Sequence, residues 1–339
     1  MLTTTAAYAG GIDRSGQSIG AIFEDGKYVE LSYGYVMPSV TGTDPFTTGS
    51  DNIAPDYGNV GLAFKTDLDD KVSLALIIDQ PFGANVSYDN AAYLIGGSGA
   101  NVETTSITAV GRYKFNENVS VFFGPRYLSA SGDYTAAQFG TVLYTSTYAS
   151  GSGTGYVAGA AYERQDIAMR VALTYSSAID LELDGTGAGG LGDLTATMPQ
   201  SVNLEFQSGV AADTLVFGSV RWAEWSQAHI TDAVFGELVS WDDDVLTYTL
   251  GVGRKFSDKF SGAVSVGYEK ELGGAVSNLS AKDGYTSISV GGTYTLDNGI
   301  ELTGGVRYIM VGDATTETIG AVFADNSAVA VGLKVAYNF

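Results

Sequence analysis

The chain has 339 residues, no cysteine and a formal net charge of −21 at pH 7. This charge argues against nucleic-acid binding, because phosphates would be repelled, and the lack of cysteine excludes a disulfide framework and a thiolate metal site. Glycine (45), tyrosine (21) and phenylalanine (15) are abundant and proline is scarce (6), while no run of 18 apolar residues could form a transmembrane helix. One large closed β-sheet fits this composition.

The amino-terminal residues contain a candidate cleavage site. Ala7-Tyr8-Ala9 precedes Gly10, which gives the small-x-small form that signal peptidases recognise. No basic region or long apolar stretch precedes it. We predict that residues 1–9 are the remnant of an export signal and that the mature protein starts at Gly10; the alternative is that the match is accidental.

From about residue 27 onward the chain consists of short segments in which apolar and small or polar residues alternate. This period of two is typical of strands that span a membrane in a closed barrel, since alternate residues face lipid. About fourteen such strands can be counted, an even number. They start near Lys27, Tyr57, Lys71, Glu103, Asn118, Thr154, Ile167, Met198, Asp213, Val245, Lys259, Gly284, Gly299 and Asn326.

The last segment, residues 328–339, shows the alternation most clearly. Val331, Leu333 and Val335 lie on one face, and Ala330 and Lys334 lie on the other. A slip of one residue would place Lys334 in lipid, at a cost of about 2–4 kcal/mol at the membrane midplane. The register of this strand is therefore well specified. The pattern alone cannot distinguish a barrel from a soluble sandwich, but its repetition, with aromatic residues near the segment ends, favours the barrel.

The connections between segments alternate between short and long. In an up-and-down barrel every second connection returns to the same side, and short turns are typical of the periplasm. The long connections cover residues 37–56, 81–102, 135–153, 179–197, 223–244, 272–283 and 312–325. Both termini should then be periplasmic, and the aromatic ending at Tyr337 and Phe339 suggests a signal for the barrel-assembly machinery; the alternative is that Phe339 merely ends an apolar face.

Several motifs occur in the order seen in one known family. They are Tyr33-Gly34-Tyr35-Val36-Met37-Pro38-Ser39-Val40-Thr41-Gly42, Asp70-Lys71-Val72-Ser73-Leu74, Gln80-Pro81-Phe82-Gly83, Gly111-Arg112-Tyr113-Lys114-Phe115-Asn116-Glu117-Asn118, Met198-Pro199-Gln200-Ser201 and Trp222-Ala223-Glu224-Trp225-Ser226-Gln227. Together they resemble the FadL-type (OMPP1/FadL/TodX) outer-membrane transporters of long-chain fatty acids and other hydrophobic compounds.

This resemblance implies an all-β, fourteen-stranded, antiparallel up-and-down barrel in a Gram-negative outer membrane. It also implies a hatch, an amino-terminal segment inside the lumen, which we assign to residues 10–26 with Asp13, Arg14, Ser15 and Gln17; residues 27–339 form the barrel. The hatch is shorter than is usual in the family and lacks its Asn-Pro-Ala motif. Substrates should leave sideways through an opening at a kink in the third strand, and family precedent suggests a monomer.

A fatty acid needs an apolar surface for its tail, worth about 0.8 kcal/mol per buried methylene, and cations or donors for its carboxylate. Candidates for a tail groove at the outer loops are Phe82, Tyr88, Tyr93, Leu94, Ile95, Phe139, Val142, Leu143 and Tyr144. These side chains could instead anchor loops among lipid headgroups. Candidates for carboxylate binding in the lumen are Arg112, Arg126, Arg170, Arg307 and Lys334, which could instead pair with Glu205, Glu269 or Glu301. The substrate could also be a neutral hydrophobic compound.

Other functions are weighed against this one. A general porin for small polar solutes, or an adhesive surface barrel with acidic loops, would show a similar strand pattern. An enzyme is not predicted, because His229 and Ser226 lack any accompanying nucleophile or oxyanion signature, and Asp242-Asp243-Asp244 lacks the glycine and glutamate of a calcium loop. No cofactor and no metal is expected. The expected partners are membrane lipid, lipopolysaccharide, whose divalent cations the acidic loops could share, and a hydrophobic small molecule.

Overall fold

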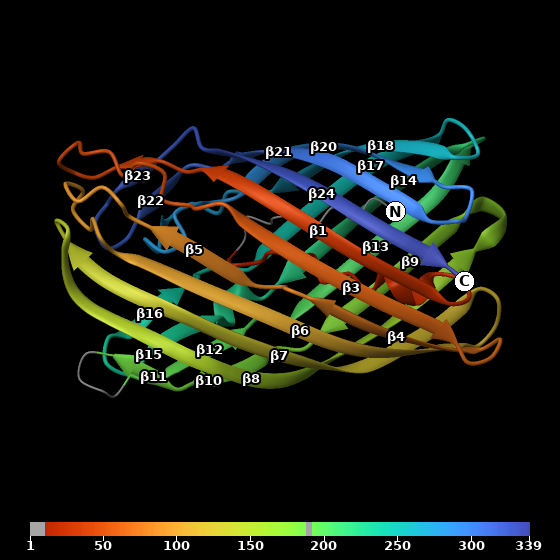
Figure 1. Cartoon of the computed structure of the whole chain (residues 1–339), viewed down its shortest axis with the longest axis horizontal. Coiled ribbons are helices and arrows are strands. Elements are labelled where there is room, and N and C mark those ends of the chain that lie inside the picture. The colour runs from red at the N-terminus through yellow and green to blue at the C-terminus, as the bar shows by residue number, and fades with distance from the viewer. Residues whose placement is uncertain (1–10, 188–191) are drawn as a thin grey trace.

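The protein is a single antiparallel β-barrel of fourteen strands, seen in a computed structural model that describes residues 11–187 and 192–339 (Figure 1). The barrel strands are β1 (Tyr28–Ser39), β3 (Tyr57–Asp67), β4 (Val72–Asp79), β6 (Gly99–Lys114), β7 (Val119–Gln138), β8 (Thr141–Arg164), β9 (Met169–Ser176), β13 (Ser201–Ala211), β14 (Thr214–Ala223), β17 (Val245–Lys255), β18 (Phe260–Glu269), β20 (Tyr285–Thr295), β21 (Glu301–Val311) and β24 (Ser327–Asn338). The fourteen strands confirm the predicted fold class. The predicted export remnant, residues 1–9, lies outside the described residues.

Pairing between the first and last barrel strands closes the sheet. β1 pairs with β24 along its whole length, for example Leu31 with Val335, and β8 pairs with β9 in the same antiparallel sense. A closed sheet satisfies the backbone groups of every strand, which is the condition for crossing hydrocarbon. None of the helices in the described residues is long and apolar enough to cross a membrane.

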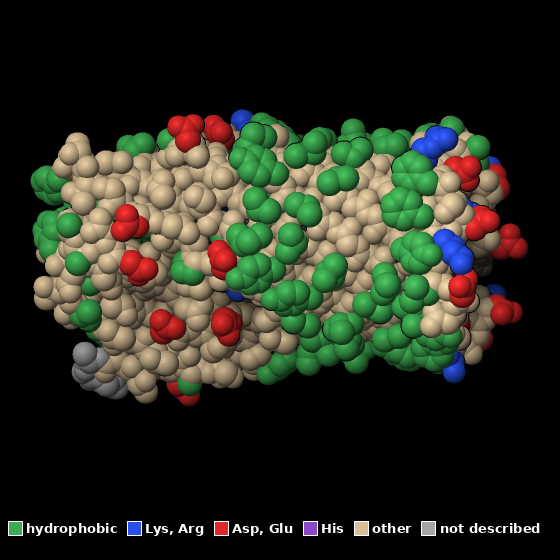
Figure 2. All heavy atoms as spheres, turned by 45° about the horizontal axis from the view of Figure 1, so that its top comes forward, with side chains coloured by type: hydrophobic (Ala, Val, Ile, Leu, Met, Phe, Trp, Pro, Cys, Tyr) green, Lys and Arg blue, Asp and Glu red, His purple; other side chains and the backbone are tan. Residues whose placement is uncertain are grey.

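The side chains of each strand alternate between lumen and exterior as the sequence predicts. On β24, Leu333 is 66% exposed and flanked by exposed Val331 and Val335, while Ala330 and Lys334 are buried. On the face shown in Figure 2, outward apolar side chains of this kind form a belt across the barrel; Lys, Arg, Asp and Glu lie at the end that carries the short turns, and further Asp and Glu are scattered over the other half. The carboxyl end of the chain lies at that same end (Figure 1). The other end carries the long connections.

The outer end of the barrel differs from the prediction at residues 135–153. These residues were expected to form a long loop, with a strand starting near Thr154, but β7 and β8 continue as one extended hairpin. Its turn is at Phe139 and Gly140, both with positive φ (47° and 74°), as a two-residue hairpin requires. The strands continue because the alternation continues: Tyr144, Ser146 and Tyr148 are buried one after another on the inner face.

Shorter strands fill the outer end. They are β2 (Gly42–Thr43), β5 (Gly83–Ser87), β10 (Ile179–Leu183), β11 (Gly185–Gly187), β12 (Leu194–Met198), β15 (His229–Asp232), β16 (Gly236–Ser240), β19 (Ala275–Val276), β22 (Ala314–Thr316) and β23 (Val322–Phe323). Of the 3₁₀ helices, η1 (Gly20–Phe23) belongs to the predicted hatch, η2 (Gln165–Ile167) lies in the short connection between β8 and β9, and η3 (Trp225–Gln227) follows β14. β10, β12, β15 and β16 form a four-stranded sheet. Its apolar side chains, including Leu181 and Ile230, share a core with Trp225. We call this sheet the cap.

Residues 11–26, the described part of the predicted hatch, are packed inside the barrel. Ile19, Ile22 and Phe23 are buried with inward residues of β4, β6 and β7, such as Ile77 and Val110. Small inward residues on the wall, mainly alanine, leave the volume that this segment occupies. The inner part of the hatch therefore packs directly on the barrel wall.

Candidate functional site

The third strand of the barrel is interrupted where the hatch meets the wall. β4 ends at Asp79 and β5 begins at Gly83, and both pair with β6. Pro81 lies between them; it has no N–H to donate and is confined to edges and irregularities of sheets. The β3–β4 ladder begins only at Leu62 opposite Ile78. We call the stretch where residues 57–61 of β3 face residues 80–83 the seam.

The hatch supplies main-chain partners at this interruption. The N–H of Arg14 donates to the Pro81 carbonyl (2.8 Å), and the N–H of Gly83 donates to the Ile12 carbonyl (2.8 Å). Asp13 and Phe82 form an isolated antiparallel bridge. The hatch thus acts as a short inner strand that takes over hydrogen bonds which the interrupted wall does not make.

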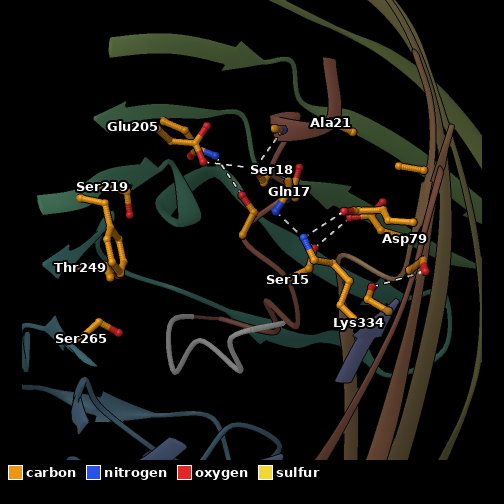
Figure 3. Close-up of a pocket in the computed structure, with 18 of the residues that line it drawn as sticks. Ser15, Gln17, Ser18, Ala21, Asp79, Glu205, Ser219, Thr249, Ser265 and Lys334 are labelled. Atoms are coloured by element: carbon orange, nitrogen blue, oxygen red, sulfur yellow. Dashed lines mark hydrogen bonds and ion pairs between the residues drawn. The ribbon is translucent and has the colours of Figure 1, made fainter. Parts of the chain in front are cut away.

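Side chains tie the hatch to opposite walls of the lumen. Asp13 pairs with Arg221 of β14 (3.3 Å), and both side chains are almost fully buried. Ser15 donates to Asp79 at the end of β4 (2.9 Å), and Arg126 of β7 donates to Gln17. Figure 3 shows Ser15 and Gln17 on the hatch beside Asp79. The hatch therefore crosses the lumen and is held on both sides.

The backbone conformation and the close packing at the outer end of the hatch require a glycine. Gly11 has a φ of +56° and lies on the indole of Trp225, so that a Cβ at this position would come within 2.3 Å of the ring. A residue with a side chain would need both an unfavourable backbone conformation and the displacement of a fully buried tryptophan. Trp225 also packs edge-on against Phe82 (6.1 Å between ring centroids). The hatch, the cap and the seam thus all pack against the indole of Trp225.

All five cations that were predicted to bind a carboxylate lie in the lumen, and each contacts protein groups there. Arg112 pairs with Glu163, Lys334 pairs with Glu30 (3.3 Å), and Arg307 donates to Ser287 and Tyr285. The other two contact the hatch: Arg126 through Gln17, and Arg170 through Phe23, whose ring lies between the guanidinium groups of Arg170 (4.5 Å) and Arg112 (4.7 Å).

The residues proposed for a tail groove do not share one surface. Phe82 is buried at the seam, and Tyr88 and Tyr93 stack on each other (5.4 Å) inside a core of the outer loops, with Leu94 and Ile95 half-buried nearby. Phe139, Val142 and Leu143 are exposed around the turn of the β7–β8 hairpin. Tyr144 is buried against Phe235 (4.1 Å). The expectation of a single groove assumed loops, whereas strand alternation sends neighbouring residues to opposite faces.

Two cavities of the lumen adjoin the hatch. The first, which we call the hatch cavity, has a volume of about 140 Å³ and lies between the hatch and the outer parts of the wall. Most of its lining is apolar, with Arg14, Asp13 and Lys282 as its charged members. Its apolar lining includes Ile12, Val36, Ile53, Ile309, Val311 and Ala328. Sequence analysis missed these wall residues, although they could have been found as the inward positions nearest the outer strand ends.

The second cavity, which we call the chamber, measures about 390 Å³ and begins at the inner side of the hatch. Serine, threonine and glycine dominate the wall opposite the hatch, and Figure 3 shows Ser219, Thr249 and Ser265 in this row. Glu205, which accepts a hydrogen bond from Ser18 (3.2 Å), also lines it. The chamber is thus polar on the wall opposite the hatch and apolar beside the seam, where Val60 and Leu62 line it.

The residues weighed for catalysis and calcium binding contact other groups. The Ser226 hydroxyl donates to Asp244 (2.6 Å), while Nδ1 of His229 lies 3.1 Å from Glu237 on the exposed edge of the cap. Within residues 11–187 and 192–339 there is no group of three or more His, Cys, Asp or Glu side chains that could hold a metal ion.

Both the sequence and the fold are similar to those of known proteins. Residues 27–339 match the family model described as "Outer membrane protein transport protein (OMPP1/FadL/TodX)". Among solved structures, a Pseudomonas aeruginosa FadL homologue has a TM-score of 0.76 at 12% identity, covering 94% of this chain and 92% of that one. The Pseudomonas putida toluene transporter TodX (0.70, 12%, 94% and 92%) and the Ralstonia pickettii toluene transporter TbuX (0.69, 14%, 94% and 91%) are also similar. No curated protein sequence matches the chain.

Proposed function

Because the chain belongs to the OMPP1/FadL/TodX family of outer-membrane transport proteins of Gram-negative bacteria, which carry hydrophobic compounds, we propose that it takes up small hydrophobic molecules of about one aromatic ring. The ligand enters between the outer loops, rests in the hatch cavity and leaves sideways through the seam. The observation that carries this proposal is the apolar cavity of about 140 Å³ between hatch and wall.

The volume of the hatch cavity supports a small ligand. An apolar cavity of about 150 Å³ in another protein binds benzene, and the hatch cavity is of that size. A long acyl chain has more than twice as many carbons as benzene, so it would have to extend out of this cavity. The TodX and TbuX structures are both described as toluene transporters, which agrees with a ligand of this size.

The position of the two cavities supports the sideways route. A hydrocarbon that crossed the chamber towards the periplasm would pass its far wall of serine, threonine and glycine and lose about 25 cal/mol for every Å² of apolar surface returned to water. Val60 and Leu62, on the lipid face beside the seam, offer an apolar surface instead. We therefore place the exit at the seam, where the β3–β4 ladder has not yet begun.

Ala328 gives a direct test of the hatch cavity. Its small side chain lines the cavity from β24, so Ala328→Phe should fill the space and reduce saturable uptake of labelled toluene by cells about tenfold. Val335→Phe, on the lipid face of the same strand, is the matched control and should transport normally. Uptake that survives Ala328→Phe would sink the assignment of this cavity as the binding site.

Long-chain fatty acids are the second candidate substrate class. The observation in their favour is that Arg14 and Lys282 line the apolar hatch cavity, where they could receive a carboxylate. Labelled oleate should compete with toluene under this alternative, and Lys282→Met should then weaken oleate uptake while sparing toluene. A general porin would instead give steady ionic conductance in planar bilayers and saturable uptake of neither compound.

Three further proposals concern assembly and surroundings. We assign the predicted hatch, residues 10–26, as the plug of the pore. The last strand ends in two stacked rings, Tyr337 and Phe339 (5.8 Å between centroids), which suit recognition by the barrel-assembly machinery. The protein acts as a monomer, with its acidic outer loops near lipopolysaccharide.

A further inference from the structure

One side chain closes the seam in place of a β-ladder. Gln80 follows the last residue of β4, and its side-chain carbonyl oxygen accepts a hydrogen bond from the backbone N–H of Val60 on β3 (2.8 Å). The main-chain register between β3 and β4 begins two residues further along, at Leu62 opposite Ile78. A backbone donor that faces the interruption is thus satisfied by a side chain that can rotate away.

The other polar groups of the interruption are satisfied without any bond to β3. The Pro81 carbonyl accepts from the hatch, and the Gly83 N–H donates to it. The Phe82 N–H and carbonyl both bond to the Thr104 hydroxyl of β6 (3.0 and 2.6 Å). If the bond between Gln80 and Val60 breaks, the remainder of the interruption can therefore keep its hydrogen bonds.

The chamber reaches the wall at this bond. Its lining includes inward residues beside the hatch, such as Ser15 and Asp79, but also Val60, Leu62 and Gln80 at the seam. Val60 is 50% exposed on the lipid face. The chamber thus extends to the wall at the seam, and Gln80 lies at that point.

We propose that Gln80 is the latch of the lateral exit: its side chain holds β3 against the interrupted strand, and its release lets a hydrophobic molecule pass from the lumen into the membrane. The inference rests on the proposed sideways route and names the residue that controls it. A neutral amide suits the task, because it offers an acceptor to a backbone N–H at membrane depth without the desolvation cost of a full charge.

The latch can be tested by labelling, independently of transport. The chain has no cysteine, so Ser32→Cys introduces one reporter. Ser32 lines the chamber on β1, and its hydroxyl lies 3.4 Å from the Gly61 carbonyl beside the seam. In proteoliposomes, a maleimide on a long alkyl chain, which stays in the bilayer, reaches Cys only through the wall. Uncharged water-soluble N-ethylmaleimide reports access through the lumen.

In this background Gln80→Leu, of similar size but without an acceptor, should increase labelling by the lipid-bound maleimide about five-fold, the effect of losing one hydrogen bond. Gln207→Leu on β13 removes a glutamine that contacts Ala168, away from the seam, and should change nothing. Labelling by N-ethylmaleimide should be equal in all three proteins, and heat-modifiable gel mobility should show all three folded.

Equal labelling of parent and Gln80→Leu by the lipid-bound reagent would overturn the latch. Toluene uptake separates this failure from a failure of the proposed function. If labelling rises in Gln80→Leu and uptake rises with it, latch and sideways route are both supported. If labelling rises while uptake is unchanged, Gln80 does close the wall and the sideways route is wrong.

Discussion

Asp13 forms the buried ion pair that joins the hatch to β14 on the far wall of the lumen. Its carboxylate is buried against Arg221, and removing one partner of a buried ion pair costs about 3–5 kcal/mol, because a charge is left without compensation. We expect Arg221→Gln to detach the outer part of the hatch. Limited proteolysis of the folded protein should then cut within residues 11–18, where the parent resists.

Two controls distinguish charge from packing at this site. Asp13→Asn combined with Arg221→Gln leaves no buried charge and should recover much of the resistance to protease. Lys255→Ala breaks an exposed ion pair with Asp258 on a short turn and should have no measurable effect. If the double variant were as sensitive as Arg221→Gln, the ion pair would not be what secures the hatch.

Asp232 gives a prediction about pH at the cap. Burial raises the pKa of its carboxyl, but hydrogen bonds from the Phe235 N–H, the Tyr148 hydroxyl and the Val234 N–H lower it by more, and the net pKa is below the usual value. A lowered folded pKa means that this carboxylate stabilises the cap fully above the ordinary aspartate pKa of about 3.9 and loses that effect as pH falls through the folded value.

Hydrogen exchange of the cap should therefore be independent of this group between pH 5 and 8, a range that lies about one unit or more above the ordinary pKa, and Asp232→Asn should speed exchange there by removing the charge-assisted bonds. Exchange in β15 and β16 would be followed by mass spectrometry at matched intrinsic rates. Identical protection in Asp232→Asn and parent at neutral pH would contradict this role.

At the scale of elements, the hatch is not part of the barrel sheet. The hatch contacts the wall through side chains and through the interrupted strand, whereas the closed ladder from β1 to β24 does not include it. Deleting residues 10–26 should leave a folded, heat-modifiable barrel and raise single-channel conductance several-fold, because the chamber and the hatch cavity then join. Unchanged conductance in planar bilayers would refute the plug. Phe23→Ala, which keeps the hatch but removes its stacking on two arginines, should give an intermediate increase.

For the whole molecule, the apolar belt sets which positions accept a charge. Leu333 is exposed on the lipid face of β24, so Leu333→Arg should lower the free energy of unfolding in liposomes by about 2–4 kcal/mol if it lies near the midplane. Val322→Arg is the control: Val322 is similarly exposed but belongs to β23 among the outer loops, beyond the belt, and should be neutral. Equal urea midpoints for the two variants would contradict the placement of the membrane.

The sequence by itself determined the barrel and its strand number. Alternation between lipid and lumen is a local property, written residue by residue in segments such as β24, and the alternation of short and long connections distinguishes the two ends of the barrel. It also placed the candidate cations on the inward faces, since a charge on the outer face would cost several kcal/mol at membrane depth. These properties follow from the two-residue period of the strands and from the cost of placing a charged side chain in lipid.

Only the tertiary structure decided what those inward residues contact. Asp13 meets Arg221 and Phe23 meets two arginines from different strands, and these contacts form when the barrel closes around the hatch, while Gln80 meets Val60 where the strand after β4 is interrupted. Likewise, β7 and β8 extend as far as a turn at Phe139, where a loop was expected. Contacts across a lumen join residues that are distant in the chain, so no periodicity encodes them; they follow from barrel circumference, register and the volume left by small side chains.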